Sequence, residues 1–185
     1  MSQPTSTFDP RQFRNALGRF ASGVTIVTTH HEGNTYGMTA NAFVSVSMNP
    51  PLVLISVDHR AAMHTHLPKS KRYGVSILAE GQDTLSNHFA GRSVDGLQVP
   101  FIERHGMPLI EGAVAYFVVK VVDAHLAGDH TLYIGEVMAL HLCSSVYDGH
   151  QVDSVKMRPI ARLGGPYYAA LGDIFHRPAL QQAPG

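Results

Sequence analysis

Two segments that are far apart in the sequence carry residues suited to holding a flat ligand. Apart from Met38, residues 37–42 have small, hydroxyl or amide side chains, and they lead into an alternating stretch that breaks at Pro50-Pro51. Small side chains let a ligand approach backbone N–H and C=O groups closely. The second segment, residues 128–137, opens with Gly128-Asp129-His130. The first segment alone could be an ordinary β-corner, but the two together favour a binding site.

Bulk composition limits the classes of function. The chain has 185 residues, with 14 basic and 14 acidic side chains and a formal net charge of zero. This balance lacks the electrostatic footprint of a nucleic-acid-binding protein, and no run of Lys or Arg indicates a membrane surface. With 44% hydrophobic and 15% charged residues, the sequence predicts one folded globular domain.

Cysteine content and the N-terminal residues favour a cytoplasmic protein. Cys143 is the only cysteine, so no internal disulfide can form, which fits a reducing compartment. Residues 1–7 are polar and do not resemble a signal peptide, and no apolar run is long enough to span a bilayer.

Strands dominate the predicted secondary structure. Asp9 and Pro10 are suited to begin a helix that carries an apolar stripe and ends at Gly23. Short helices are expected at 60–67, stopped before Pro68, and at 82–90, while 93–110 reads as loop. Gly33-Asn34 reads as a hairpin turn. Strands are expected at 24–29, 36–48, 52–57, 73–78, 113–124, 131–142 and 160–163.

This order of elements does not read as repeated βαβ units, so a doubly wound fold is not expected. The pattern favours a mainly β fold, a closed antiparallel barrel with a few peripheral helices. There is no Gly-x-Gly-x-x-Gly or Walker-type phosphate motif.

Five motifs in order over one domain resemble the flavin reductase family, the small NAD(P)H:flavin oxidoreductase components of two-component monooxygenases. They are residues 38–43, 45–51, 85–91, 106–113 and 128–130. The resemblance runs from Phe13 to Leu171, which implies a domain at 13–171, an N-terminal extension at 1–12 and a C-terminal tail at 172–185. It also implies an FMN-binding split β-barrel, a homodimer, and a separate oxygenase partner. The expected reaction is hydride transfer from NADH or NADPH to N5 of FMN or FAD.

The resemblance also assigns site residues. The flavin ring would lie against the loop of Met38, Thr39, Ala40, Asn41 and Ala42, held largely through backbone groups. The ribityl chain and phosphate would meet Ser56, Val57, Asp58, Arg60, Ala62 and Met63, and a helix end would reach the flavin through His88, Phe89 and Ala90. Asp129, His130 and Tyr167 would bind the nicotinamide nucleotide.

Several of these residues also have plainer interpretations. Arg60 could be a solvated residue at a helix start, Phe89 could belong to the core, and His130 could be a turn histidine facing solvent. Many relatives place a Ser or Thr near Met63, where its hydroxyl meets the phosphate, and this chain has Ala62-Met63 instead. Backbone N–H groups around 61–63 could compensate.

Two other classes of function remain open from the sequence. The same fold could serve as a flavin-binding or electron-transfer module without turnover. The 12 histidines, including His64-Thr65-His66, could suggest a metal-binding protein, but no Cys pair, His-Glu-x-x-His motif or carboxylate cluster accompanies them. No metal site is therefore expected.

Overall fold

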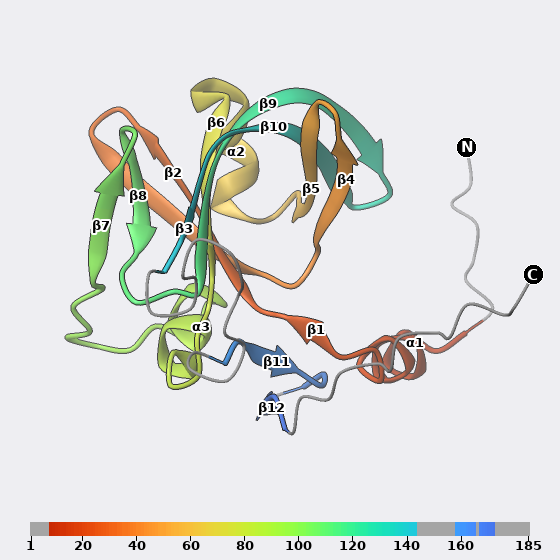
Figure 1. Ribbon diagram of the computed structural model, residues 1–185. Coiled ribbons are helices and arrows are strands. Elements are labelled where there is room, and N and C mark those ends of the chain that lie inside the picture. The colour runs from red at the N-terminus through yellow and green to blue at the C-terminus, as the bar shows by residue number, and fades with distance from the viewer. Residues whose placement is uncertain (1–7, 144–157, 166, 173–185) are drawn as a thin grey trace, which may run out of the picture.

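The mainly β class predicted from the sequence is confirmed (Figure 1). The computed structural model describes residues 8–143, 158–165 and 167–172. Three helices occur in these ranges: α1 (Pro10–Leu17), α2 (Ala62–Ser70) and α3 (Asp83–Phe89). The expected boundary between residues 12 and 13 falls inside α1, and most of the expected tail, 172–185, lies outside the described residues. None of the helices in the described ranges is long and apolar enough to cross a membrane.

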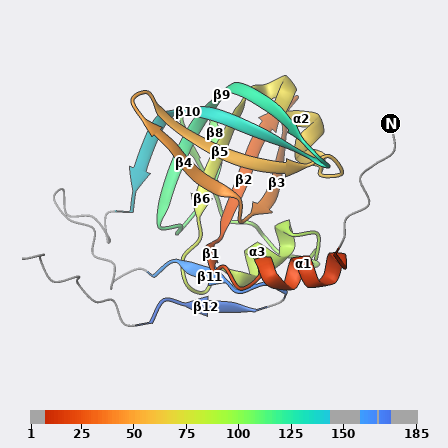
Figure 2. The same cartoon turned by 90° about the vertical axis from the view of Figure 1, so that its right-hand side faces the viewer.

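One antiparallel sheet of seven strands forms the body of the molecule, in the order β3-β2-β6-β9-β10-β5-β4. Its strands are β2 (Thr25–His31), β3 (Asn34–Ala40), β4 (Phe43–Met48), β5 (Pro51–Asp58), β6 (Arg72–Ile77), β9 (Ala115–Ala127) and β10 (His130–Leu142). The edge strands β3 and β4 are joined through Asn41-Ala42, yet no strand pairing among the described residues closes the sheet between its two edges. The sheet is curved but open along one line (Figures 1 and 2).

Two smaller sheets accompany the main one. β1 (Ser22–Gly23), β11 (Ile160–Arg162) and β12 (Tyr168–Ala170) form a sheet that lies with α1 and α3 below the main sheet in Figure 2. β7 (Phe101–Arg104) and β8 (Met107–Ile110) form a hairpin.

The main core lies between the concave face of the large sheet and α2. Alternate residues of β5, Val53, Ile55 and Val57, are buried, as expected for a strand with one face toward a core. Met63 and Leu67 lie one helical turn apart on α2 and pack into the same cluster. This packing fixes α2 across one end of the sheet, next to the ends of β3 and β5.

The segment 93–110 was predicted as loop, and the structure corrects this with the β7–β8 hairpin. The reason is local: His105 and Gly106 both have positive φ, 51° and 72°, which builds a tight two-residue turn. The flanking strands have four residues each, and Pro108 within one of them weakened the sequence signal.

Helix α2 does not stop before Pro68 but continues through it to Ser70. A proline inside a helix removes one backbone hydrogen bond. Here the loss falls in the last turn, and burial of Leu67 on the preceding position favours the helix.

Near the N-terminus, α1 does begin at Pro10 with the side chain of Asp9 as its cap, but it ends at Leu17 and not at Gly23. None of its residues is buried, so its predicted apolar stripe faces away from the described core. The β2–β3 turn is formed by Glu32 and Gly33, with φ of 50° and 77°, and not by Gly33-Asn34.

Candidate flavin-binding site

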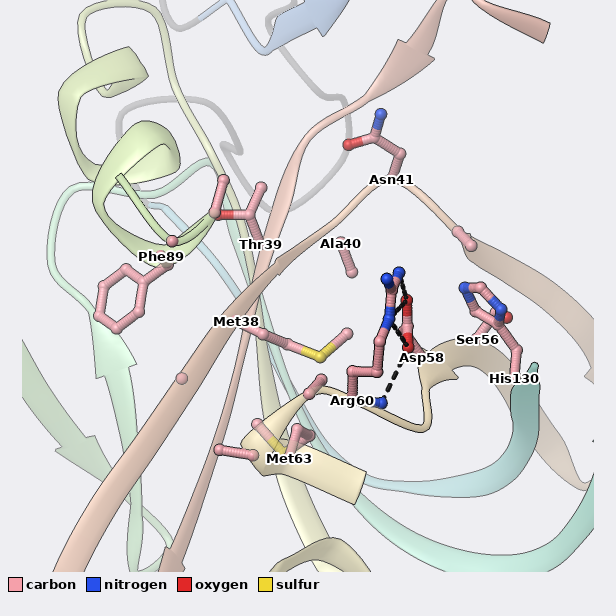
Figure 3. Close-up of a pocket in the computed structure, with 16 residues that line it drawn as sticks. Met38, Thr39, Ala40, Asn41, Ser56, Asp58, Arg60, Met63, Phe89 and His130 are labelled. Atoms are coloured by element: carbon pink, nitrogen blue, oxygen red, sulfur yellow. Dashed lines mark hydrogen bonds and ion pairs between the residues drawn. The ribbon is translucent and has the colours of Figure 1, made fainter. Parts of the chain in front are cut away.

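A pocket of about 760 Å³ lies where the main sheet fails to close (Figure 3). One wall is the edge strand β3, and the other is built from the end of β5, the start of β10 and the first turn of α2. The end of α3 completes it. Its lining residues are Gly37, Met38, Thr39, Ala40, Asn41, Ala42, Ser56, Asp58, Arg60, Ala61, Ala62, Met63, Phe89, Ala90, Gly91 and His130.

The β3 wall presents backbone more than side chain. Among the described strands β3 pairs only with β2, so its other edge has no ladder partner. Two hydroxyls hold this edge in place: Thr25 Oγ1 donates to the carbonyl of Ala40 over 2.8 Å, and Thr39 Oγ1 donates to the carbonyl of Ser86 over 2.6 Å. The second bond ties β3 to α3. The two bonds therefore hold the wall in place, with the backbone groups of its free edge available to a ligand.

Gly37 is required for the fit of α3 against β3. A Cβ on Gly37 would lie 2.5 Å from the ring of Phe89, so only glycine allows this close contact. Phe89 contacts Phe101 edge to face at 6.3 Å between ring centroids, which fixes the ring from the other side. Phe89 thus packs against the buried core and also lines the pocket. It lies on the side of the pocket away from His130 (Figure 3).

Charge gathers at the other side of the pocket. Arg60 donates to both carboxylate oxygens of Asp58, with Nη2 at 2.6 Å from Oδ2 and Nε at 3.1 Å from Oδ1. These hydrogen bonds hold the pKa of the Asp58 carboxyl well below its usual range. Arg60 remains largely exposed, so its guanidinium is accessible to an anion.

The first turn of α2 adds backbone donors to the same side. Ala61 stands at the N-cap position and provides no side-chain hydrogen bond. The N–H groups at the start of the helix therefore lack a capping side chain, and this end of the helix favours negative charge. Arg60, Ala61, Ala62 and Met63 all line the pocket.

His130 stands opposite β3 at the start of β10. Its Nδ1 donates to Oδ1 of Asp129 over 2.6 Å, and this bond lowers the pKa of the Asp129 carboxyl. Because an ionised carboxylate only accepts, the proton lies on Nδ1, which leaves Nε2 as the ring nitrogen for a ligand. His130 therefore joins the pocket with a fixed tautomer.

The structure brings most of the predicted site residues together. Thirteen of them line the pocket: Met38, Thr39, Ala40, Asn41, Ala42, Ser56, Asp58, Arg60, Ala62, Met63, Phe89, Ala90 and His130.

Four predicted site residues lie elsewhere. Val57 points into the core, His88 accepts a hydrogen bond from the backbone N–H of Val94, and Asp129 acts on His130 from outside. Tyr167 is 69% exposed and does not line the pocket. Their contacts with ligands stay predictions.

Three lining residues were not among the predicted site residues: Gly37, Ala61 and Gly91. Each adjoins a predicted segment, and two are glycines whose backbone is exposed by the lack of a side chain. The available sequence signal was glycine itself: Gly37 directly precedes the motif at 38–43, and Gly91 is the last residue of the motif at 85–91.

Comparison with known proteins decides the family. The model of the flavin reductase like domain matches residues 17–156. An NADH-dependent flavin reductase from a Rhodococcus species is 52% identical over 134 residues, which is 71% of this chain and 76% of that protein. The chain belongs to the flavin reductase family.

Two further flavin reductase relatives extend the comparison. The solved structure of the flavin reductase PheA2 superposes with a TM-score of 0.79 at 41% identity and covers 90% of this chain and 100% of that one. The reductase component of a 4-nitrophenol 4-monooxygenase/4-nitrocatechol 2-monooxygenase from Rhodococcus opacus is 37% identical over 131 residues, 70% of this chain and 71% of that protein.

The pocket fits the flavin that the family implies. Its volume is in the range of sites for cofactor-sized ligands. It joins a flat wall of backbone and small side chains to a cationic turn, which suits a planar ring carrying a phosphate on a flexible chain. Within the described residues, no three His, Cys, Asp or Glu side chains gather in a way that could hold a metal ion.

Proposed function

We propose that this protein uses NADH, with NADPH as the alternative donor, to reduce FMN or FAD by hydride transfer to flavin N5. The observation that carries the proposal is the position of His130 across the pocket from the backbone edge of β3. In such a slot the flavin ring would lie against the backbone wall, and the nicotinamide would lie between that ring and the imidazole. The NADH-dependent flavin reductase from Rhodococcus supports the choice of NADH.

The β3 wall would hold the flavin ring. Bound flavin supplies the hydride acceptor, and the protein contributes position and electrostatics. Backbone N–H groups between residues 38 and 42 would favour the negative charge that develops at the pyrimidine end of the ring upon reduction. No side chain has to give or take the hydride, so Ser56, Asp58 and His130 would act in this pocket by binding and positioning the ligands.

The charged side of the pocket would hold the ribityl chain and phosphate. Ser56 offers a hydroxyl, and Arg60 offers a guanidinium that can grip phosphate oxygens in a fork. The start of α2, where Ala62 and Met63 lie, would contribute backbone N–H groups in place of the hydroxyl side chain found in many relatives. Asp58 would act by orienting Arg60, because its carboxylate would repel the phosphate.

His130 would bind the nicotinamide. With its proton fixed on Nδ1 by Asp129, its Nε2 can accept a hydrogen bond from a carboxamide. Tyr167 is exposed and lies outside the pocket lining, so it would have to move toward the pocket to cover the bound nucleotide.

The apolar outer face of the sheet supports a homodimer. Val44, Leu54 and Ile134 stand side by side in the β4–β5–β10 ladders. Val44 is 56% exposed, more than expected for a large apolar side chain on an isolated protein. Ser56 and Asp58 continue the outer face of β5 into the pocket, so a second copy would lie beside the flavin site.

The reduced flavin would pass to a separate oxygenase, as the name of the Rhodococcus opacus relative indicates for that protein. NADH use and the single cysteine favour a cytoplasmic location. A domain at 13–171 with short terminal extensions fits these assignments.

Steady-state oxidation of NADH and NADPH with added FMN, FAD and riboflavin tests the proposed function. Turnover with NADH that requires added flavin supports it. Tight flavin binding without NADH oxidation would favour a carrier or electron-transfer module. Metal analysis of untagged protein would test the histidine-based alternative.

A further inference from the structure

A buried hydroxyl lies behind the pocket with an imidazole on either side. Thr131 Oγ1 is 3.1 Å from Nε2 of His59 and 3.1 Å from Nε2 of His64. Thr131 is only 5% exposed, and the two rings lie 4.7 Å apart at a tilt of 49°. These contacts join residues 67 and 72 positions apart in sequence.

The chemistry of the three groups makes this cluster specific. A threonine hydroxyl has one proton to donate and lone pairs to accept. With both imidazoles neutral, the hydroxyl donates to one Nε2 and accepts from the other, so the two rings take opposite tautomers. A valine has the same shape but can make neither bond, and a serine can make both.

The position of Thr131 connects this cluster to the site. Side chains alternate along a strand, so His130 enters the pocket while Thr131 points to the opposite face, beside the buried Val57. Of these two adjacent residues of β10, His130 therefore lines the pocket and Thr131 lies on the core side of the strand.

The two histidines bracket the turn that lines the charged side of the pocket. His59 follows β5 directly, and its backbone N–H donates to the backbone carbonyl of Asp129 over 3.0 Å. His64 lies in the first turn of α2. The four residues between them, 60–63, all line the pocket. One hydroxyl thus holds both ends of this turn.

We propose that Thr131, with His59 and His64, is a positioning residue that holds residues 60–63 in the conformation that receives the flavin phosphate. This inference rests on the proposed function. A turn held before the ligand arrives loses less conformational freedom on binding. The cluster therefore acts on phosphorylated flavins and not on the ring, so it determines how strongly FMN is preferred to riboflavin.

The test compares dissociation constants for FMN and riboflavin, measured by fluorescence quenching at one ionic strength, in wild type, Thr131→Val and Thr131→Ser. In Thr131→Val, FMN affinity is expected to fall roughly tenfold, because both hydrogen bonds of the buried hydroxyl are lost, while riboflavin affinity stays within about twofold. Thr131→Ser is expected to restore most of the FMN affinity.

Thr29→Val is the matched control. Thr29 is also fully buried, and its hydroxyl bonds Ser70 Oγ and the carbonyl of Arg72 at the opposite end of α2. This variant also loses a buried hydroxyl next to α2, but it is expected to keep the wild-type ratio of FMN to riboflavin affinity. If Thr131→Val does not fold, His59→Ala, at an exposed position, removes one of the two hydrogen bonds and is expected to show a smaller loss of FMN affinity, again with riboflavin affinity kept.

The outcomes separate the two proposals. An unchanged FMN to riboflavin ratio in the variants, or an equal loss for both ligands, overturns the positioning role while wild-type NADH oxidation leaves the proposed function standing. A wild type that binds FMN no tighter than riboflavin also overturns the positioning role. A wild type that oxidises no NADH with any flavin overturns the proposed function itself.

Discussion

Asp58 lies directly opposite His130 in the β5–β10 ladder, and each of the two is held by a second charged residue. Arg60 grips Asp58, while Asp129 accepts from His130. Asp58, Arg60 and His130 line the same side of the pocket (Figure 3), and Asp129 holds His130 from outside it. This arrangement leaves two groups available to ligands, the outer part of the Arg60 guanidinium and Nε2 of His130.

Replacing Arg60 by glutamine is expected to weaken FMN binding roughly fivefold to tenfold at low salt, because a charge-assisted hydrogen bond to phosphate is lost. Riboflavin binding should not change. Added salt should reduce the difference between variant and wild type, since the lost interaction is electrostatic and exposed. Arg11→Gln, on α1 outside the pocket, is the charge-matched control. Equal losses for FMN and riboflavin would contradict phosphate binding by Arg60.

His130→Ala is expected to raise the KM for NADH or to lower kcat, with flavin affinity near that of wild type. The chain offers a close control in His125, an exposed histidine on β9 whose Nε2 lies 3.0 Å from Oδ2 of Asp123. His125→Ala removes a similar histidine–carboxylate pair but should leave NADH kinetics unchanged. NADH kinetics that are unchanged in both variants would remove His130 from the nicotinamide site.

The lowered pKa of Asp58 predicts how the Asp58–Arg60 pair responds to pH. A carboxyl whose pKa is lower in the folded than in the unfolded chain adds stability above the unfolded pKa, and this stability is lost as the pH falls toward the folded pKa. The difference in melting temperature between wild type and Asp58→Asn should therefore be constant from about pH 8 to pH 5 and shrink only below about pH 4. Because the Arg60 side chain is largely exposed, solvent screens the pair and the difference should be small. Calorimetry would contradict this if the difference changed between pH 5 and pH 8.

Tyr73 is fully buried, and its hydroxyl has no hydrogen-bond partner among the described residues. Burial of this group raises its pKa, so it stays neutral. Tyr73→Phe should raise the melting temperature by about 2–4 °C, since a desolvated hydroxyl is removed without a loss of shape. Thermal unfolding measures the effect, and a lower melting temperature would mean that the hydroxyl has a partner.

Gly135, beside Tyr73, is expected to tolerate no larger residue. A Cβ there would lie 2.3 Å from Cγ1 of Val119 and 2.6 Å from the Tyr73 hydroxyl oxygen. Gly135→Ala should therefore destabilise the protein by about 1–3 kcal/mol in denaturant unfolding. An unchanged midpoint would show that the core next to β10 repacks without cost.

Val44→Glu is expected to shift the protein from dimer to monomer in sedimentation velocity, because the variant places a charge in the exposed apolar row of the outer sheet face. Val94→Glu, at an exposed valine in the segment after α3, should leave the association state unchanged. A monomeric wild type, or a Val44→Glu variant that remains dimeric, would contradict the proposed interface.

The sequence predicted the pocket well where function depends on residue type. The stretch 38–42 stood out because four of its five side chains are small or polar. The structure places residues 38–40 on the unpaired edge of β3 and all five residues in the lining of the pocket. It predicted short elements poorly, because β7 and β8 have four residues each and their turn depends on a positive φ at His105, a residue type with no strong turn signal. The contacts of Thr131 could not be predicted, since periodicity shows which face a residue occupies but not which distant side chain it meets.

The alternation of His130 and Thr131 makes the β9–β10 connection sensitive to length. Only Gly128 and Asp129 separate the two strands. Inserting or deleting one residue there would shift the register of β10 by one, turning the imidazole inward and the hydroxyl outward. The spacing of this corner is therefore constrained as tightly as its composition, in which Gly128 has a positive φ of 65° and Asp129 hydrogen-bonds His130.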